Sequence, residues 1–82
     1  MYYVYFLASE RNRDLYIGSS ESLERRVRLH NAGRVRSTKA YRPWKVLGYE
    51  TYITRSEAVR REMFLKNHQQ KEILKKRFGL AA

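Results

Sequence analysis

The chain has 82 residues, no cysteine, and a formal net charge of +10 from 18 Lys and Arg against 8 Asp and Glu. At this length it forms one small domain over residues 1–82, and the lack of cysteine excludes disulfides and thiolate metal sites. The charge predicts a polyanion as the partner, with nucleic acid the leading candidate.

The basic excess lies in the later part of the chain. Residues 1–33 carry five basic and four acidic residues, residues 34–54 five and one, and residues 55–82 eight and three. No stretch reaches the roughly 20 apolar residues that a membrane helix requires, and residues 2–8 lack the features of a secretion signal. We therefore expect a cytoplasmic protein that makes no use of a membrane.

Two antiparallel strands are predicted first. Residues 2–8 and 14–18 are rich in aromatic and β-branched residues, and the polar residues 9–13 predict a turn between them. Side chains alternate between the two faces of a strand, and the aliphatic rows are expected to face one core. This alternation predicts that Tyr5 and Tyr16 share the opposite face.

A helix is predicted over residues 21–31. Ser19 or Ser20 would cap its start, and a glycine at position 33 would end it. On a helical wheel, Arg26 and His30 lie one turn apart at the border of the apolar face. Taken alone, the arginine is more often a solvated charge and the histidine more often a packed residue.

The middle of the chain predicts a surface connection and a third strand. Residues 34–43 are basic, poor in apolar residues, and end in proline, which is typical of a loop or a single helical turn. Residues 44–52 alternate between apolar and polar well enough to predict a strand.

Two helices are predicted for the last third. Thr54 and Glu57 form a capping box that predicts a helix over residues 55–67. A second helix is predicted over residues 69–78, and residues 79–82 are expected to fray.

Glu62 is the charged residue that is hardest to explain as a surface residue. It falls inside an apolar stripe on the wheel of the predicted 55–67 helix. A carboxylate in that place is partly desolvated and requires a partner, a proton or a cation. Lys66, one turn later, offers a simple ion pair as the alternative. The stripe consists of Ala58, Val59, Met63 and Leu65.

Five short segments follow one another in a recognisable order: Tyr3-Val4-Tyr5, Tyr16-Ile17-Gly18, Leu23-Glu24-Arg25-Arg26, His30-Asn31 and Arg61-Glu62-Met63. Two further runs are Ser37-Thr38-Lys39 and Arg42-Pro43-Trp44-Lys45. In this order the five segments resemble the GIY-YIG nuclease domain over nearly the whole chain, and the two further runs are typical of its short stand-alone, UPF0213-like subgroup. One position departs from the pattern, because Tyr3 stands where the family has its first glycine.

The resemblance implies an α+β fold, with a three-stranded antiparallel sheet flanked by helices in the order β-β-α-β-α-α. It also implies a DNA endonuclease, with a role in DNA repair, that uses one divalent cation. Glu62 would bind Mg²⁺ or Mn²⁺, and Arg26 would neutralise charge on the phosphate. Tyr5 or Tyr16 would orient or deprotonate the attacking water, and His30 would assist.

Basic side chains around the predicted 34–43 loop and after Glu62 are expected to contact nucleic-acid phosphates. DNA is favoured over RNA, and a homodimer or a protein partner would supply specificity. Two alternatives stay open: a non-catalytic nucleic-acid-binding module on the same scaffold, and an interaction domain for an acidic protein. The predicted phosphate contacts are Arg34, Arg36, Lys39, Arg42, Lys45 and Lys66.

Overall fold

Aromatic and β-branched residues build a sheet at the centre of the structure, a computed structural model that describes residues 1–80. The central strand β1 (Tyr2–Ser9) pairs antiparallel with β2 (Leu15–Ser20) on one side and with β3 (Trp44–Tyr52) on the other. The strand order is β2-β1-β3, so the predicted three-stranded antiparallel sheet is confirmed.

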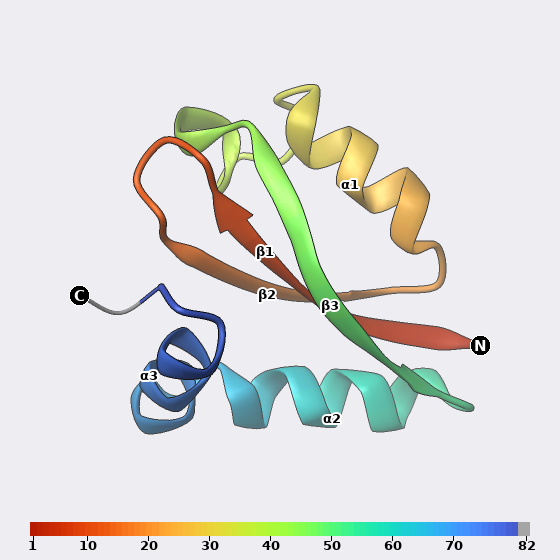
Figure 1. The fold of residues 1–82 in the computed structure, drawn as a ribbon. Helices are drawn as coiled ribbons and strands as arrows, with labels where there is room; N and C mark the ends of the chain where they lie inside the picture. The colour runs from red at the N-terminus through yellow and green to blue at the C-terminus, as the bar shows by residue number, and fades with distance from the viewer. Residues whose placement is uncertain (81–82) are drawn as a thin grey trace.

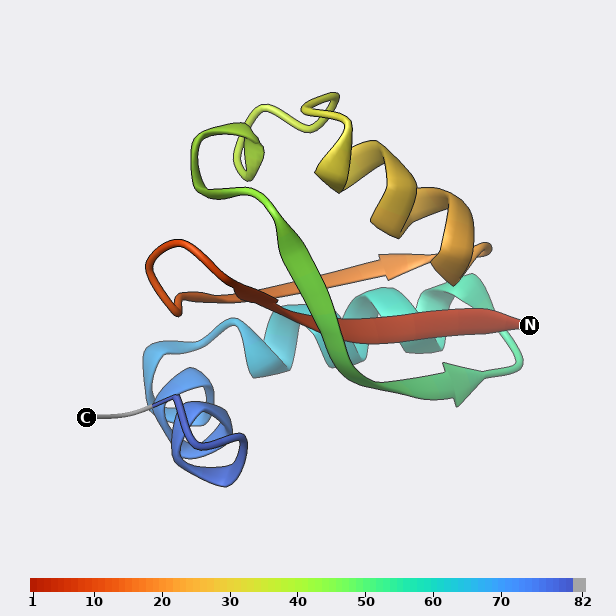
Figure 2. The same cartoon turned by 45° about the horizontal axis from the view of Figure 1, so that its top comes forward.

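Helices cover both faces of this sheet (Figure 1). Helix α1 (Leu23–Asn31) lies on one face, and α2 (Arg55–Leu65) and α3 (His68–Arg77) lie on the other, as the turned view also shows (Figure 2). A single 3-10 turn at Lys39–Tyr41 connects α1 to β3. The predicted element order is confirmed, and within residues 1–80 no helix is long and apolar enough to cross a membrane.

Alternation along β1 divides the core into two clusters, one on each face of the sheet. On the α2 and α3 face, the buried members are Val4, Phe6, Leu15, Ile17, Ala58, Leu65 and Leu74. On the α1 face, the buried members are Tyr5, Leu7 and Trp44, and Tyr16 packs against them. Tyr5 and Tyr16 therefore share one face, as the alternation predicts.

The capping residue at the start of α2 is the predicted one, whereas that of α1 is not. Thr54 and Glu57 form the predicted capping box, each side chain accepting the backbone N–H of the other residue at 3.2 Å. The cap of α1 is Ser22, so the prediction of Ser19 or Ser20 is wrong. Those two serines instead extend β2, because they pair with β1.

The face that α2 turns to the sheet is narrower than the predicted stripe. Ala58 and Leu65 are buried, whereas Val59 and Met63 are 37% and 68% exposed. Glu62 lies between the two buried residues at spacings of four and three, so it stays on the inward face with its side chain 19% exposed. The inward placement of Glu62 is confirmed, but the stripe around it is smaller.

The last described residues are ordered by α3. Gly79 has a φ of +72°, and the backbone N–H groups of Gly79 and Leu80 bond to the carbonyls of Lys76 and Lys75 at 3.1 and 2.7 Å. This is the Schellman pattern that ends helices at glycine. These bonds connect residues 79–80 to the end of α3, and the rest of the predicted frayed tail, residues 81–82, lies outside the described residues.

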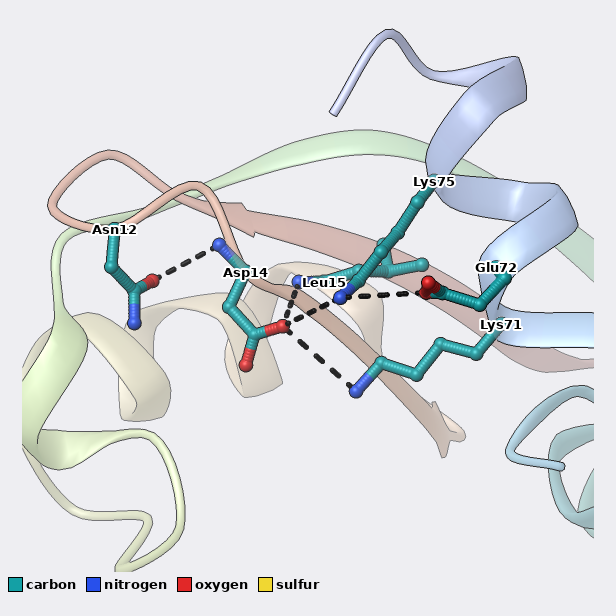
Figure 3. A network of polar contacts seen from close by, with 6 residues as sticks. All are labelled: Asn12, Asp14, Leu15, Lys71, Glu72 and Lys75. Atoms are coloured by element: carbon teal, nitrogen blue, oxygen red, sulfur yellow. Dashed lines mark hydrogen bonds and ion pairs between the residues drawn. The ribbon is translucent and has the colours of Figure 1, made fainter. Parts of the chain in front are cut away.

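The turn between β1 and β2 is tied to α3 (Figure 3). Asp14 Oδ1 lies 3.5 Å from Lys75 Nζ and 4.0 Å from Lys71 Nζ, and Arg13 donates to the Gly79 carbonyl at 2.7 Å. Surface pairs of this kind contribute about 0–1 kcal/mol each. Together they connect the β1–β2 turn to α3 along the length of the helix, from Lys71 to Gly79 just after its end.

Candidate active site

Two phenols and an imidazole meet on the α1 face of the sheet. Tyr5 and His30 are fully buried, and Tyr5 Oη lies 3.0 Å from His30 Nε2. The Tyr16 ring lies 4.8 Å from the His30 ring and 6.3 Å from the Tyr5 ring, centroid to centroid. Strands β1 and β2 and the last turn of α1 thus bring together three of the five predicted catalytic residues.

Gly18 makes room for this arrangement. It pairs with Tyr5 across the β1–β2 ladder, and a Cβ atom at position 18 would lie 2.5 Å from Tyr5 Oη and 3.0 Å from Tyr16 Cε2. Neither distance leaves space for a carbon atom, so any side chain at position 18 would push Tyr5 away from His30. The glycine of the Tyr16-Ile17-Gly18 triplet is therefore required by the packing of the phenols.

Burial controls the protonation of this pair. Burial raises the pKa of the Tyr5 phenol above its usual value, although the nearby Arg26 guanidinium opposes the rise. Burial, together with the charge of Arg26, lowers the pKa of His30 from 6.5 to about 4. At neutral pH the phenol keeps its proton and the imidazole is uncharged.

Arg26 carries a charge into this buried environment. Its side chain is half-buried, and its Nε is fully buried with no hydrogen-bond partner in the described part of the chain. An unsatisfied buried donor costs about 1–3 kcal/mol, and more when it belongs to a charged group. An anion that accepts from this guanidinium would recover that cost.

Glu62 approaches the same cluster from α2. Ser19 donates a hydrogen bond to Glu62 Oε1 at 2.5 Å, and Lys66 Nζ lies 2.7 Å from Oε2. The same ammonium lies 5.5 Å from the centroid of the Tyr16 ring. The predicted Glu62–Lys66 ion pair is therefore present, and Lys66 connects the carboxylate to the Tyr16 ring.

The donors around Glu62 fit a lightly held divalent cation. No group of three or more His, Cys, Asp or Glu side chains suited to a metal exists among residues 1–80. Mg²⁺ does not require one, because it keeps several waters and takes substrate phosphate oxygens as further ligands. The Lys66 side chain is 46% exposed, and its ammonium would have to leave Glu62 for a cation to bind there.

A groove beside Tyr16 opens the site to the surface. It measures about 270 Å³ and is lined by Leu15, Tyr16, Ile17, Lys66 and Lys71. Lys71 was missed by sequence reasoning, because only the docking of α3 against β2 brings it there. Two lysines therefore line an open groove beside Tyr16 and give it a positive charge.

The six predicted phosphate contacts do not form one surface. Arg34, Arg36, Lys39 and Arg42 are exposed on the segment between α1 and β3. Lys45 is also exposed, but it lines a groove with Phe78 and Leu80 on the α3 side of the sheet, the face opposite Tyr5. Lys66 lies at the cluster itself, paired with Glu62.

Thr38 and Asn31 support the cluster and were not predicted as site residues. Thr38 is fully buried, and its Oγ1 lies 2.8 Å from His30 Nδ1. The Asn31 amide binds the backbone N–H and carbonyl of Trp44 at 2.6 and 2.9 Å. The Trp44 indole donates to the Thr38 carbonyl at 2.9 Å. The Asn31 amide therefore ties the start of β3 to the end of α1.

A small α+β domain with paired phenols, an arginine and a glutamate beside its edge strand has the arrangement expected of a nuclease-type domain. The sequence model of the GIY-YIG catalytic domain matches residues 1–77, and the chain belongs to this family.

Relatives of similar length support the same assignment. UPF0213 protein SH2523 of Staphylococcus haemolyticus is 36% identical over 75 residues, which is 90% of each chain. UPF0213 protein OB0043 of Oceanobacillus iheyensis is 35% identical over 75 residues, 90% of this chain and 86% of its own. UPF0213 protein HQ_3675A of Haloquadratum walsbyi is 37% identical over 68 residues, 82% of this chain and 75% of its own. No solved structure matches the chain.

Proposed function

We propose that the chain is a metal-dependent endonuclease that hydrolyses phosphodiester bonds in DNA. The observation that carries the proposal is the buried Nε of Arg26, which has no hydrogen-bond partner among residues 1–80 and lies beside the phenol of Tyr5. A guanidinium held in this way, with Tyr16 and Glu62 nearby, is a site for a phosphate that undergoes chemistry rather than for a structural ion pair.

The two phenols have different roles in this proposal. Tyr5 is fully buried and holds its proton against His30, so it fixes the pocket around Arg26. Tyr16 is half-buried and lines the open groove, so it faces the substrate and orients the attacking water. Arg26 binds the phosphate and offsets the charge that grows on its oxygens as the reaction proceeds.

The reaction is a hydrolysis that needs no further reactant. The water, oriented by Tyr16, gives up a proton to solvent, and its oxygen forms a bond to phosphorus. The bond from phosphorus to the leaving oxygen breaks, and that oxygen takes a proton from solvent. A bound Mg²⁺ or Mn²⁺ would polarise the phosphate and stabilise the leaving oxygen. Glu62 would hold the cation after exchanging its contact with Lys66.

The substrate is held mostly through its backbone. The exposed basic residues of the 34–42 segment and the lysines of the groove at Tyr16 are suited to contact phosphates, which carry no sequence information. A second copy of the chain or a protein partner would therefore supply any sequence preference. DNA is the favoured substrate.

The test compares two substitutions of glutamate by glutamine. In the presence of Mg²⁺ or Mn²⁺, Glu62→Gln should slow cleavage of plasmid and oligonucleotide DNA on the order of a hundredfold, the equivalent of about 3 kcal/mol. Glu72→Gln is the matched control, because that side chain lies on α3 and is 49% exposed. Equal cleavage by both variants, or wild-type cleavage that survives removal of divalent ions by a chelator, would contradict the proposal.

The Glu62–Lys66 pair also gives the non-catalytic alternative a specific observation. The Glu62 carboxylate requires no metal when the Lys66 ammonium, 2.7 Å from Oε2, already balances its charge. The scaffold would then serve only to bind nucleic acid. A binder of this kind loses affinity steeply between about 50 and about 200 mM salt and does not respond to Mg²⁺. Salt-sensitive DNA binding by a wild-type protein that cleaves neither DNA nor RNA would establish this alternative.

A further inference from the structure

A chain of buried hydrogen bonds extends from Tyr5 beyond His30. Tyr5 Oη lies 3.0 Å from His30 Nε2, and Thr38 Oγ1 lies 2.8 Å from His30 Nδ1. The Thr38 hydroxyl in turn donates to the carbonyl of Val35 at 3.3 Å. Tyr5, His30 and Thr38 are all fully buried, so solvent does not compete for these bonds.

The order of donors in this chain follows from its last member. The Val35 carbonyl only accepts, and it takes the Thr38 hydroxyl hydrogen beside the backbone N–H groups of Thr38 and Lys39, so the Thr38 oxygen accepts from His30. A neutral imidazole carries one N–H, so a hydrogen on Nδ1 leaves Nε2 as an acceptor. The Tyr5 hydroxyl then donates to Nε2. This order gives every hydrogen in the chain an acceptor.

The opposite order leaves one hydrogen without a partner. If Nε2 carried the hydrogen, it would donate to the Tyr5 oxygen, and the Tyr5 hydroxyl would need another acceptor. Two charged groups act on that phenol: Arg26, which has donors only, and Glu62, whose hydrogen bond among the described residues is with Ser19 and not with Tyr5. A buried hydroxyl without an acceptor costs about 1–3 kcal/mol, which disfavours this order.

We propose that Thr38 is a positioning residue that fixes His30 as its Nδ1–H tautomer and thereby directs the hydroxyl hydrogen of Tyr5 to Nε2. The oxygen lone pairs of Tyr5 are then left to accept from the Arg26 guanidinium, which has donors only. The effect on cleavage rests on the proposed nuclease function, whereas the tautomer itself does not.

Thr38 is also connected to Tyr16, through Trp44. The Thr38 carbonyl accepts from Trp44 Nε1 at 2.9 Å, and the Trp44 ring lies 6.1 Å from the Tyr16 ring, edge to face. The side chain of Thr38 therefore acts on Tyr5 through His30, and its backbone helps to place Tyr16 through Trp44. A substitution that removes only the hydroxyl should disturb the hydrogen bond to His30 and preserve the hydrogen bond from Trp44.

The experiment uses the full chain and reads the two ring nitrogens of His30 by proton–nitrogen NMR. His68 is exposed and is the only other histidine, so His68→Gln assigns the signals. In the wild type and in Thr38→Ser, which keeps the hydroxyl, His30 should be the Nδ1–H tautomer. In Thr38→Val, which has nearly the same shape but no hydroxyl, the Nε2–H tautomer should gain population. Cleavage by Thr38→Val should fall about tenfold in kcat with little change in KM.

The outcomes separate this inference from the proposed function. A wild-type His30 in the Nε2–H tautomer overturns the inference at once, even if no variant folds. An unchanged tautomer and unchanged kcat in Thr38→Val also overturn it. An Nδ1–H tautomer that depends on the hydroxyl supports it even if the wild type cleaves no nucleic acid, a result that would overturn only the proposed function.

Discussion

His30 makes the stability of this domain depend on pH in a range where few other groups titrate. Its pKa is lowered from 6.5 to about 4 in the folded chain. Between those values the unfolded state binds more protons than the folded state, so stability falls as the pH falls. The full difference corresponds to about 3 kcal/mol, and about 2 kcal/mol of it should already be lost at about pH 5. For a domain of this size, that is a decrease in Tm of roughly 8–16 °C.

Trp44 provides the assay, because it is the only tryptophan and is 5% exposed in the folded state. Denaturant unfolding followed by its fluorescence, at about pH 7 and about pH 5, measures the loss while most carboxylates stay ionised. His30→Gln should flatten the dependence, whereas His68→Gln, at an exposed position, should keep it. Equal stability of the wild type at both pH values would refute the reasoning. So would a loss of stability between the two pH values that is as large in His30→Gln as in the wild type.

Two further predictions test the packing and the groove. Gly18→Ala should destabilise the fold by about 1–3 kcal/mol and abolish cleavage, because its Cβ would meet the Tyr5 hydroxyl at 2.5 Å. In Gly48→Ala the added Cβ would lie 4.0 Å from its nearest neighbour, so the Tm measured by thermal unfolding should not decrease. Lys71→Ala should raise KM for DNA and reduce the salt dependence of binding by about one phosphate. Lys76→Ala, on the exposed side of α3, is its control, and equal effects of the two would remove the groove from the binding surface.

The fold could be predicted because its local signals agree with one another. Alternating aromatic residues predict the strands, and Thr54 with Glu57 predicts the start of α2. Alternation alone also placed Tyr5 and Tyr16 on one face, which the register confirms. These signals depend on neighbours in sequence, and the structure differs where they compete. Ser22 caps α1 because Ser19 and Ser20 are taken up by pairing with β1.

The environment of the cluster could not be predicted in the same way, because it depends on contacts between distant segments. Thr38 meets His30 only when the segment after α1 folds back over the helix, and nothing in its sequence neighbourhood marks a hydrogen bond of this kind. Lys71 reaches Tyr16 only through the docking of α3. The helical wheel placed His30 at the border of the buried face, whereas the structure buries it fully.

The unusual residue at position 3 can now be placed relative to the cluster. Tyr3 packs edge to face on Tyr49, with ring centroids 5.6 Å apart, and lines a groove of about 580 Å³ beside the first turns of α1. His30 lies in the last turn of the same helix, and none of the five predicted catalytic residues lines that groove. The two glycine positions of the family pattern therefore differ in what they require. Position 18 must be small because Tyr5 fills its space, whereas the tyrosine at position 3 turns to Tyr49 and to a groove that none of the predicted catalytic residues lines.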